Sequence, residues 1–272
     1  MNIDSKIKMN TGNEIYQFGL GVWRSGEATK DAVLTALKIG YRHIDAAAIY
    51  GNEEAVGEAI RESGIPREEL FITTKLWNQD MRDERVMEAF ETSLKKLGLD
   101  YVDLYLIHWP VKDKYIKSYK VMEEIYKSGR AKAIGVSNFK IHHLEDLLAN
   151  TEIVPAVNQM EFNPQIQDNA LLEMCKEKGI VFEAWSPLGS GACLENEDIK
   201  KIGEKYNKSV AQVIIRWILQ RGIVVFPKSV HEERIKENAD VFDFELTNEE
   251  IELINGMNKN IRTGADPDTF TF

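Results

Sequence analysis

Short apolar runs alternate with amphipathic stretches along the whole chain. Most of the runs are rich in Val, Ile and Phe and show little alternation between apolar and polar residues: Phe18–Leu20, Tyr41–Ile44, Leu70–Thr74, Val102–Ile107, Ala133–Val136, Pro155–Asn158, Ile180–Ala184 and Ile223–Phe226. Strands that are apolar on both faces are typical of a parallel sheet covered by helices. The pattern therefore predicts eight buried parallel strands.

The stretches between these runs have the spacing or the capping residues of helices. Four helices are predicted in this way: Thr29–Lys38, Arg85–Leu97, Val210–Gln220 and Ile251–Met257. Ser209 and Gln212 have the spacing of a capping box, as do Thr247 and Glu250. Helices thus separate successive strands along the chain.

Eight strands alternating with helices in 272 residues predict a single (β/α)8 barrel, also called a TIM barrel, spanning residues 1–272. A doubly wound dinucleotide-binding sheet is the alternative, and it requires the pattern G-x-G-x-x-G at the start of a helix. Gly19 and Gly21 are followed by Val22, Trp23 and Arg24, with no third glycine. The barrel is therefore favoured.

The two ends of the chain differ from this repeat. The residues KMNTGNEIYQ precede the first strand and predict a β-hairpin with its turn at Thr11–Asn13. The tail after Met257 has no clear periodicity, and we expect an irregular segment that crosses the surface.

Composition limits the class of protein. The chain is 43% hydrophobic and 29% charged, with a net charge of -10, which is typical of a globular protein without nucleic-acid or anionic membrane partners. There is no apolar signal segment, and the two cysteines do not suggest a disulfide or zinc site. We expect a cytoplasmic protein. A monomer is favoured, because no coiled-coil or interface segment appears.

Polar and aromatic side chains follow the ends of nearly all the predicted strands: Asp45, Lys75, His108, Ser137, Asn138, Gln159, Trp185, Ser186 and Lys228. Barrel enzymes have their active sites at this end of the strands. A single charged residue there usually marks only where burial stops. Asp45, Lys75 and His108 on three successive strands favour a site, because ionisable groups at an apolar mouth shift each other's pKa.

Tyr50 lies five residues beyond Asp45, in a short loop able to fold over the barrel mouth. A phenol has a pKa of about 10, which is high for acid–base chemistry at neutral pH. We expect the ammonium of Lys75, held by Asp45, to lower the pKa of Tyr50. A packed loop tyrosine without a chemical role is the alternative.

Several motifs occur in the order typical of one family. They read DAAAIYGNEEAVGEAI, ITTKLW, DLYLIHWP, AIGVSNF, VNQMEFNP, EAWSPLGSG and FPKS. Over essentially the whole chain the sequence resembles the aldo-keto reductases, most closely the short bacterial-type branch with glyoxal reductases and 2,5-diketo-gluconate reductases. The resemblance implies a barrel enzyme that reduces small aldehydes and ketones with NADPH.

The resemblance also implies a catalytic tetrad of Asp45, Tyr50, Lys75 and His108. Tyr50 would donate a proton to the carbonyl oxygen as hydride moves from the nicotinamide to the carbonyl carbon. Lys75, paired with Asp45, would tune Tyr50. His108 would orient the carbonyl and share in proton delivery.

The residues implied as NADPH contacts extend over the rest of the mouth: Val22, Trp23, Ser137, Asn138, Gln159, Trp185, Ser186, Leu188, Ser190, Lys228, Ser229, Arg234, Glu237 and Asn238. Trp185 would stack on the nicotinamide. Lys228, Ser229 and Arg234 near a helix start would bind the 2′-phosphate and select NADPH over NADH. An ordinary solvated turn is the alternative for these three, and His231 stands where some relatives have arginine.

Trp23, Trp77 and Trp109 follow strand ends and are predicted to line the substrate pocket with Tyr50 and His108, core packing being the alternative. The segment after Trp109 and the tail are both short. They predict an open pocket with broad selectivity for small aldehydes, α-dicarbonyls or keto-sugars.

Two other functions remain open. One is an NADPH-binding sensor or regulatory subunit with little turnover, since a barrel of this kind could bind the cofactor without catalysis. The other is a metal-dependent hydrolase, which is disfavoured because the histidines form no recognisable ligand set: 43, 108, 142, 143 and 231. We expect no metal.

Overall fold

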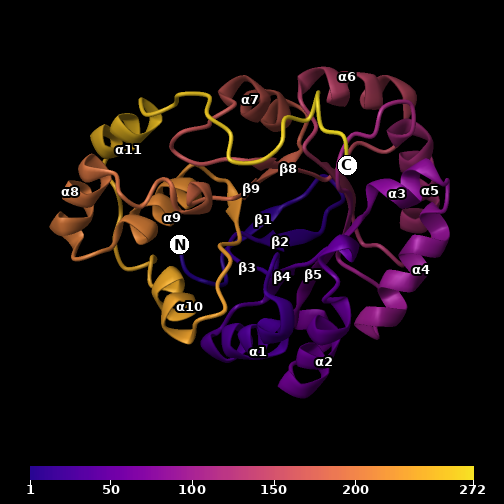
Figure 1. Ribbon diagram of the computed structural model, residues 1–272, viewed down its shortest axis with the longest axis horizontal. Coiled ribbons are helices and arrows are strands. Elements are labelled where there is room, and N and C mark those ends of the chain that lie inside the picture. Colours follow the sequence, from indigo (N-terminus) through magenta and orange to yellow (C-terminus); the bar gives the residue numbers. More distant parts are fainter.

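The computed structural model describes residues 1–272, and its centre is a barrel of eight parallel strands (Figure 1). The strands are β3 (Leu20–Gly21), β4 (His43–Asp45), β5 (Phe71–Leu76), β6 (Leu104–Ile107), β7 (Ile134–Ser137), β8 (Val157–Glu161), β9 (Val181–Trp185) and β10 (Val224–Val225). They pair in sequence order from β3 to β10. Bridges from Phe18 to Val225 and from Gly21 to Lys228 join the first strand to the last. The predicted barrel is confirmed.

An antiparallel hairpin precedes the barrel, as predicted. It consists of β1 (Lys6–Lys8) and β2 (Glu14–Tyr16). Two residues of this segment, Met9 and Ile15, are buried. They pack against the apolar residues inside the barrel, among them Leu104. The hairpin thus covers the end of the barrel opposite the predicted site.

Helices surround the strands (Figure 1): α1 (Thr29–Ile39), α2 (Glu53–Ser63), α3 (Asn78–Arg82), α4 (Val86–Leu97), α5 (Tyr115–Lys127), α6 (Ile141–Asn150), α7 (Asn169–Glu177), α8 (Glu197–Tyr206), α9 (Val210–Gln220), α10 (Glu232–Ala239) and α11 (Asn248–Asn255). Both predicted capping boxes, at Ser209 and Thr247, are present. Helix α11 begins three residues before the predicted Ile251, because its first turn is polar and carries no apolar signal.

The predicted strands differ from the observed ones mainly at their edges. For example, the apolar run Tyr41–Ile44 begins before β4, whose ladder starts only at His43. Tyr41 is buried because it packs under the helices, where its hydroxyl donates to the carbonyl oxygen of Ile235. Hydrophobicity therefore marks burial, whereas the ladder depends on pairing with neighbouring strands.

Alternation along the strands determines what faces the barrel interior. Leu104 and Leu106 belong to the apolar cluster inside the barrel, and His108 continues the same face two residues later. Gln159 likewise continues the face of Val157. Since side chains repeat every two residues in a strand, the polar groups form a layer above the apolar one.

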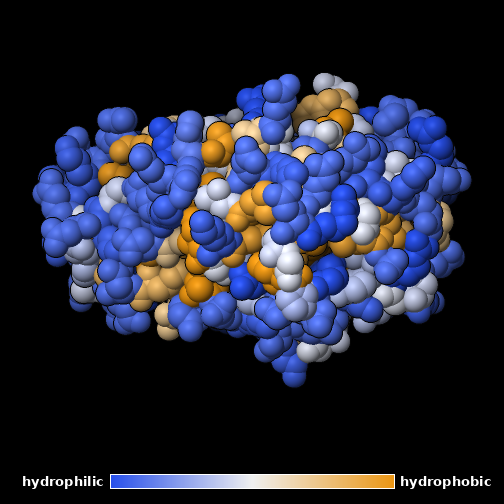
Figure 2. Space-filling view, turned by 90° about the horizontal axis from the view of Figure 1, so that it is seen from below, coloured by the Kyte–Doolittle hydropathy of each residue, from blue (hydrophilic) through white to orange (hydrophobic).

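The outer surface is mostly hydrophilic on the side of α1, α2 and α10, with smaller hydrophobic areas between the polar side chains (Figure 2). This fits amphipathic helices whose apolar faces pack on the barrel. None of the helices combines the length and apolar character needed to span a bilayer.

Candidate active site

Lys75 lies at the centre of the polar layer, and its ammonium group is enclosed by protein. Its Nζ donates to Asp45 Oδ2 at 2.7 Å and to the carbonyl oxygen of Ala46 at 2.9 Å. A third contact reaches Tyr50 Oη at 3.4 Å. These three contacts match the three N–H donors of an ammonium group, so the side chain is fixed in one orientation.

The loop after β4 carries Tyr50 back to this ammonium group. A 3-10 helix, η2 (Ala48–Tyr50), forms after Ala47, which is extended. It ends at Gly51, whose φ of 69° is in the left-handed region that glycine adopts without a Cβ penalty. The structure therefore brings together Asp45, Tyr50 and Lys75, as the sequence predicted.

Burial and charge act in opposite directions on these groups. Burial alone would lower the pKa of Lys75, but Asp45 and Tyr50 more than offset it and the pKa is raised. Burial raises the pKa of Tyr50, and the charge of Lys75 reduces this effect without overcoming it. The expected net lowering of the pKa of Tyr50 is therefore wrong. Tyr50 therefore keeps its proton at neutral pH.

His108 completes this group as a neutral ring. Burial, followed by the charge of Lys75, holds the pKa of His108 well below its ordinary value. Its ring stands edge-on to Tyr50 and Trp77, with centroids 5.7 and 5.3 Å away. Nδ1 is enclosed without a hydrogen-bond partner. The ring is therefore uncharged at neutral pH.

A second set of contacts, among Ser137, Asn138, Gln159 and Trp185, forms a polar surface beside these groups, which we call the shelf. Asn138 has a left-handed φ of 66°, and its Nδ2 donates to the carbonyl oxygen of His108 at 2.9 Å. Trp185 Nε1 donates to Asn138 Oδ1 at 2.9 Å. Ser137 Oγ donates to the carbonyl oxygen of Gln159, also at 2.9 Å. These contacts fix a partly exposed indole next to the cluster of Asp45, Tyr50, Lys75 and His108.

Gln159 connects this shelf to a carboxyl group that the sequence analysis missed. Its Nε2 donates to Asp45 Oδ1 at 2.9 Å and to Glu183 Oε2 at 2.8 Å. Glu183 lies inside the apolar run of β9 and has no exposed surface. The available signal was a carboxylate within an otherwise apolar strand.

The residues expected to bind a 2′-phosphate lie at the start of α10. Lys228 and Arg234 are exposed, and neither has a carboxylate within 4.0 Å. Ser229 Oγ accepts from the backbone N–H of His231 at 3.1 Å, which orients the hydroxyl at the helix start. Two free cations beside a helix N-terminus fit a phosphate group.

The remaining expected cofactor contacts follow the same rim. Asn238 is buried, whereas Glu237 is exposed and accepts from Ser209 Oγ at 2.5 Å. Val22 is buried, and its carbonyl oxygen accepts from Asn52 Nδ2 at 2.8 Å. Asn52 was not predicted from the sequence. It fixes the backbone that precedes Trp23.

The loop after β9 presents a group of hydroxyls. Ser186 and Ser190 both have left-handed φ values, 50° and 52°. The Ser186 Oγ lies 3.3 Å from both Ser190 Oγ and Thr263 Oγ1. Leu188 packs against the core between the two serines. The strained loop and its hydroxyls suit the polar diphosphate portion of a dinucleotide.

The C-terminal tail lies against part of the mouth, a contact that the prediction of an open pocket did not include. Phe272 stacks on Trp77 with centroids 5.9 Å apart and an angle of 2°. Phe270 and Phe272 also approach Trp109, at 5.1 and 5.2 Å. The tail is short, but it runs across the strands toward α3 (Figure 1). Its two aromatic rings lie against Trp77 and Trp109. Trp23 remains 50% exposed at the rim.

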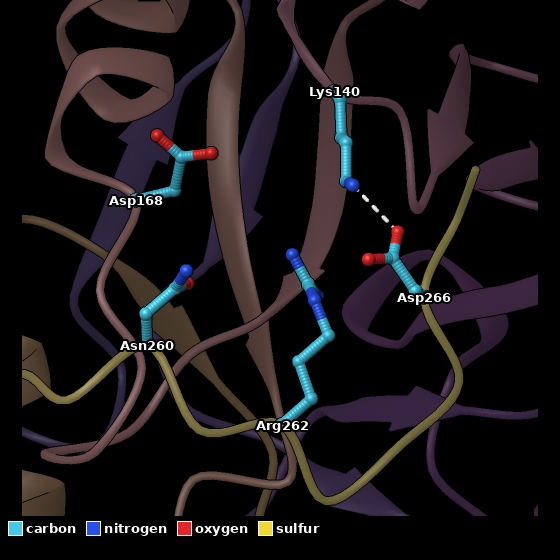
Figure 3. A pocket seen from close by; sticks show the side chains of 5 residues that line it. All are labelled: Lys140, Asp168, Asn260, Arg262 and Asp266. Atoms are coloured by element: carbon cyan, nitrogen blue, oxygen red, sulfur yellow. Dashed lines mark hydrogen bonds and ion pairs between the residues drawn. The ribbon is translucent and has the colours of Figure 1, made fainter. Parts of the chain in front are cut away.

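Polar contacts hold the tail in this position. Glu161, buried at the end of β8, accepts from the backbone N–H and the hydroxyl of Thr263 at 2.6 and 2.5 Å. Lys140 donates to Asp266 at 2.5 Å, next to Arg262 and a polar cavity of about 460 Å³ (Figure 3). Because these contacts fix both the start and the middle of the tail, its aromatic end is directed over the mouth.

Gly264 shows how closely the tail approaches the shelf. A Cβ at this position would lie 2.3 Å from Cη2 of Trp185, which is far below a van der Waals contact. Only glycine fits there without displacing the indole. The tail therefore restricts Trp185 from the side opposite its hydrogen bond to Asn138.

Comparisons of the sequence and the fold with known proteins identify the family of this chain. The model of the "Aldo/keto reductase family" matches residues 17–259. The glyoxal reductase of Bacillus subtilis (strain 168) is 53% identical, covering 100% of this chain and 99% of that protein. The methylglyoxal reductase of Escherichia coli (strain K12) is 48% identical, covering 97% of each chain. A Bombyx mori aldo-keto reductase in complex with NADP has a TM-score of 0.91 and 39% identity, covering 98% of this chain and 97% of its own.

These findings define the protein first as a barrel oxidoreductase that acts on carbonyl groups. More specifically, the chain belongs to the aldo/keto reductase family. Its relatives include bacterial glyoxal and methylglyoxal reductases.

Proposed function

We propose that this protein reduces small aldehydes and ketones, including α-dicarbonyls and keto-sugars, to alcohols with NADPH, and that Tyr50 is the proton donor. The position of Lys75 carries this proposal. Its ammonium lies 2.7 Å from Asp45 and 3.4 Å from Tyr50 inside the barrel mouth. A phenol that keeps its proton beside a fixed cation is arranged to release that proton when an oxyanion develops.

Each residue has a defined part in this reaction. NADPH, when bound, supplies the hydride that adds to the carbonyl carbon. Tyr50 donates its proton to the carbonyl oxygen as negative charge develops there. Lys75 stabilises the phenolate that remains, and Asp45 keeps Lys75 charged and in place. His108 is neutral and holds the carbonyl oxygen through Nε2.

The shelf and the outer rim would hold the cofactor. Trp185 offers a half-exposed face for the nicotinamide, with Ser137, Asn138 and Gln159 around its amide. The hydroxyls of the loop after β9 would face the diphosphate. Lys228 and Arg234 would bind the 2′-phosphate, since neither is neutralised by a carboxylate within 4.0 Å. Complexes of related structures with NADP and NADPH support this choice of cofactor.

The pocket wall suits a small carbonyl substrate. Trp23, Trp77, Trp109 and Phe272 supply apolar surface, while Tyr50 and His108 are the polar groups at its base. An apolar wall with a few directed polar groups is typical of small-molecule sites. The glyoxal and methylglyoxal reductases among the relatives support α-dicarbonyls as substrates.

We propose that the protein acts as a monomer in the cytoplasm, without nucleic-acid or membrane partners. The net charge of -10 disfavours binding to polyanions. Light scattering at micromolar concentration, with and without NADPH, tests the monomer; a dimer mass would contradict it.

The activity is tested by following NADPH absorbance with methylglyoxal and with an aromatic aldehyde. Turnover of either substrate with NADPH is expected, with NADH as the comparison. Tight NADPH binding without turnover of any carbonyl would instead favour the sensor or regulatory subunit.

A further inference from the structure

Glu183 is a buried carboxyl group to which the proposed reaction assigns no part. It lies on β9 with no exposed surface, and its Oε1 is enclosed without a hydrogen-bond partner. Its other oxygen, Oε2, accepts from Gln159. A buried polar group that is only partly satisfied costs stability, so its presence calls for a function other than packing.

The amide of Gln159 has only one orientation that suits its neighbours. Its Nε2 lies 2.9 Å from Asp45 Oδ1 and 2.8 Å from Glu183 Oε2. An amide nitrogen has two N–H donors, and here each has a carboxyl acceptor. Reversing the amide would place its carbonyl oxygen against the oxygens of Asp45 and Glu183. Gln159 Oε1 is therefore held away from both carboxyl groups and is free to accept.

We propose that Glu183 is a positioning residue that fixes the amide of Gln159, so that Gln159 Oε1 accepts a hydrogen bond from the carboxamide N–H of the nicotinamide. This inference rests on the proposed function, because it assigns Gln159 to the cofactor. Without Glu183, one N–H of Gln159 loses its acceptor and the amide can rotate. Asp45 alone would then orient Gln159 while it also holds Lys75.

The protonation of Glu183 agrees with this role. Burial, then the charge of Asp45, raises the pKa of Glu183 to about 8, and Lys75 lowers it only in part. The group is therefore mostly protonated at neutral pH. Its carbonyl oxygen still accepts from Gln159, and its proton occupies the side without a partner. An uncharged oxygen is thus sufficient to accept the hydrogen bond from Gln159. A glutamine at position 183 would also supply such an oxygen.

The test compares Glu183→Met with Glu183→Gln. Methionine matches the shape of glutamate without an acceptor oxygen, and we expect it to weaken NADPH binding about 3- to 10-fold, as for one lost hydrogen bond. Glutamine is expected to recover most of this loss. The melting temperature of both variants is measured as well, and we expect Glu183→Met to lose thermal stability because a buried N–H of Gln159 is left without an acceptor.

A second readout needs no cofactor. In the protein without NADPH, the side-chain N–H signals of Gln159 in 15N NMR should exchange slowly with water in the wild type and faster in Glu183→Met. Glu53→Met is the matched control, since Glu53 is also buried and accepts from a strand residue, Thr74, at 2.6 Å. This control should lose thermal stability and keep its NADPH affinity.

Three results would overturn the proposal: wild-type NADPH affinity in Glu183→Met, unchanged exchange of the Gln159 amide, or no recovery in Glu183→Gln. Failure of the proposed function would look different. In that case the wild-type protein itself would neither bind NADPH nor reduce carbonyls, and the exchange of Gln159 would still decide whether Glu183 fixes its amide.

Discussion

The proposed catalytic cluster, which consists of Asp45, Tyr50, Lys75 and His108, and the expected phosphate site use charge in opposite ways. Lys75 and Asp45 are almost completely buried, and their charged atoms have partners within the protein. Lys228 and Arg234 are exposed and have no carboxylate partner within 4.0 Å. The first region is organised before any ligand binds, whereas the second leaves its cations free for an anion that the ligand brings.

This difference implies different sensitivities. Buried groups respond to substitution and to pH, because any change leaves a polar group unsatisfied in a low-dielectric environment. Exposed cations respond mainly through ligand affinity and salt, because water solvates them when the ligand is absent. Substitutions in the two regions should therefore separate catalysis from cofactor selection.

The largest effect is expected for Lys75→Met. Loss of the ammonium removes the support for the phenolate, so kcat should fall by about 10²- to 10⁴-fold. The variant should also lose about 3–5 kcal/mol of unfolding free energy, because Asp45 is left buried without its partner. Steady-state kinetics and denaturant unfolding measure the two effects. The double variant with Asp45→Asn should recover stability but not activity; full kcat in Lys75→Met would contradict the comparison.

A smaller and more selective effect is expected for Arg234→Ala. Loss of one charge-assisted contact should weaken NADPH binding about 10- to 100-fold and leave NADH binding unchanged. Lys236→Ala is the control on the same helix, because Lys236 is already paired with Glu232. Fluorescence titration with both cofactors checks this. Equal losses for NADPH and NADH would remove the 2′-phosphate role.

The smallest effect is a pH dependence of stability from the buried region. Burial lowers the pKa of His43 to about 4, against an ordinary value of 6.5. The folded state therefore binds fewer protons than the unfolded one below pH 6.5, and stability falls as the pH decreases from there towards 4. Protonation of His43 alone should lower the free energy of unfolding by about 2 kcal/mol at pH 5 relative to pH 7.5. Denaturant unfolding of wild type and His43→Gln should show a smaller pH slope in the variant; an identical slope would be inconsistent with a buried neutral His43.

Much of the proposed catalytic cluster was predictable because strand ends in a barrel share one rim. Asp45, Lys75 and His108 each end an apolar run or follow it closely, and the short distance from Asp45 to Tyr50 limits where the loop can reach. Glu183 was missed because it lies within such a run, where the apolar neighbours dominate the pattern.

The pattern predicted an irregular tail, and no helix or strand follows α11, but it did not predict the contacts of that tail. Phe270 and Phe272 stand in a segment without periodicity, so their contacts with Trp77 and Trp109 depend only on the three-dimensional path of the chain. That path is determined by single contacts such as Lys140 with Asp266, which have no signature in the sequence. Likewise, a nearby cation suggested a lowered pKa for Tyr50, but the extent of burial, which reverses the direction, is a tertiary property.

Substitution of Tyr50 by phenylalanine tests most directly whether the phenol beside Lys75 donates the proton. In Tyr50→Phe, kcat with methylglyoxal should fall by about 10²- to 10⁴-fold while the Kd for NADPH stays nearly unchanged. Tyr105→Phe is the matched control, since Tyr105 is also buried but its hydroxyl has no partner and lies outside the cluster; this variant should keep wild-type kcat. If Tyr50→Phe retained most of its kcat, the proton would come from another group and the proposed role of Tyr50 would be wrong.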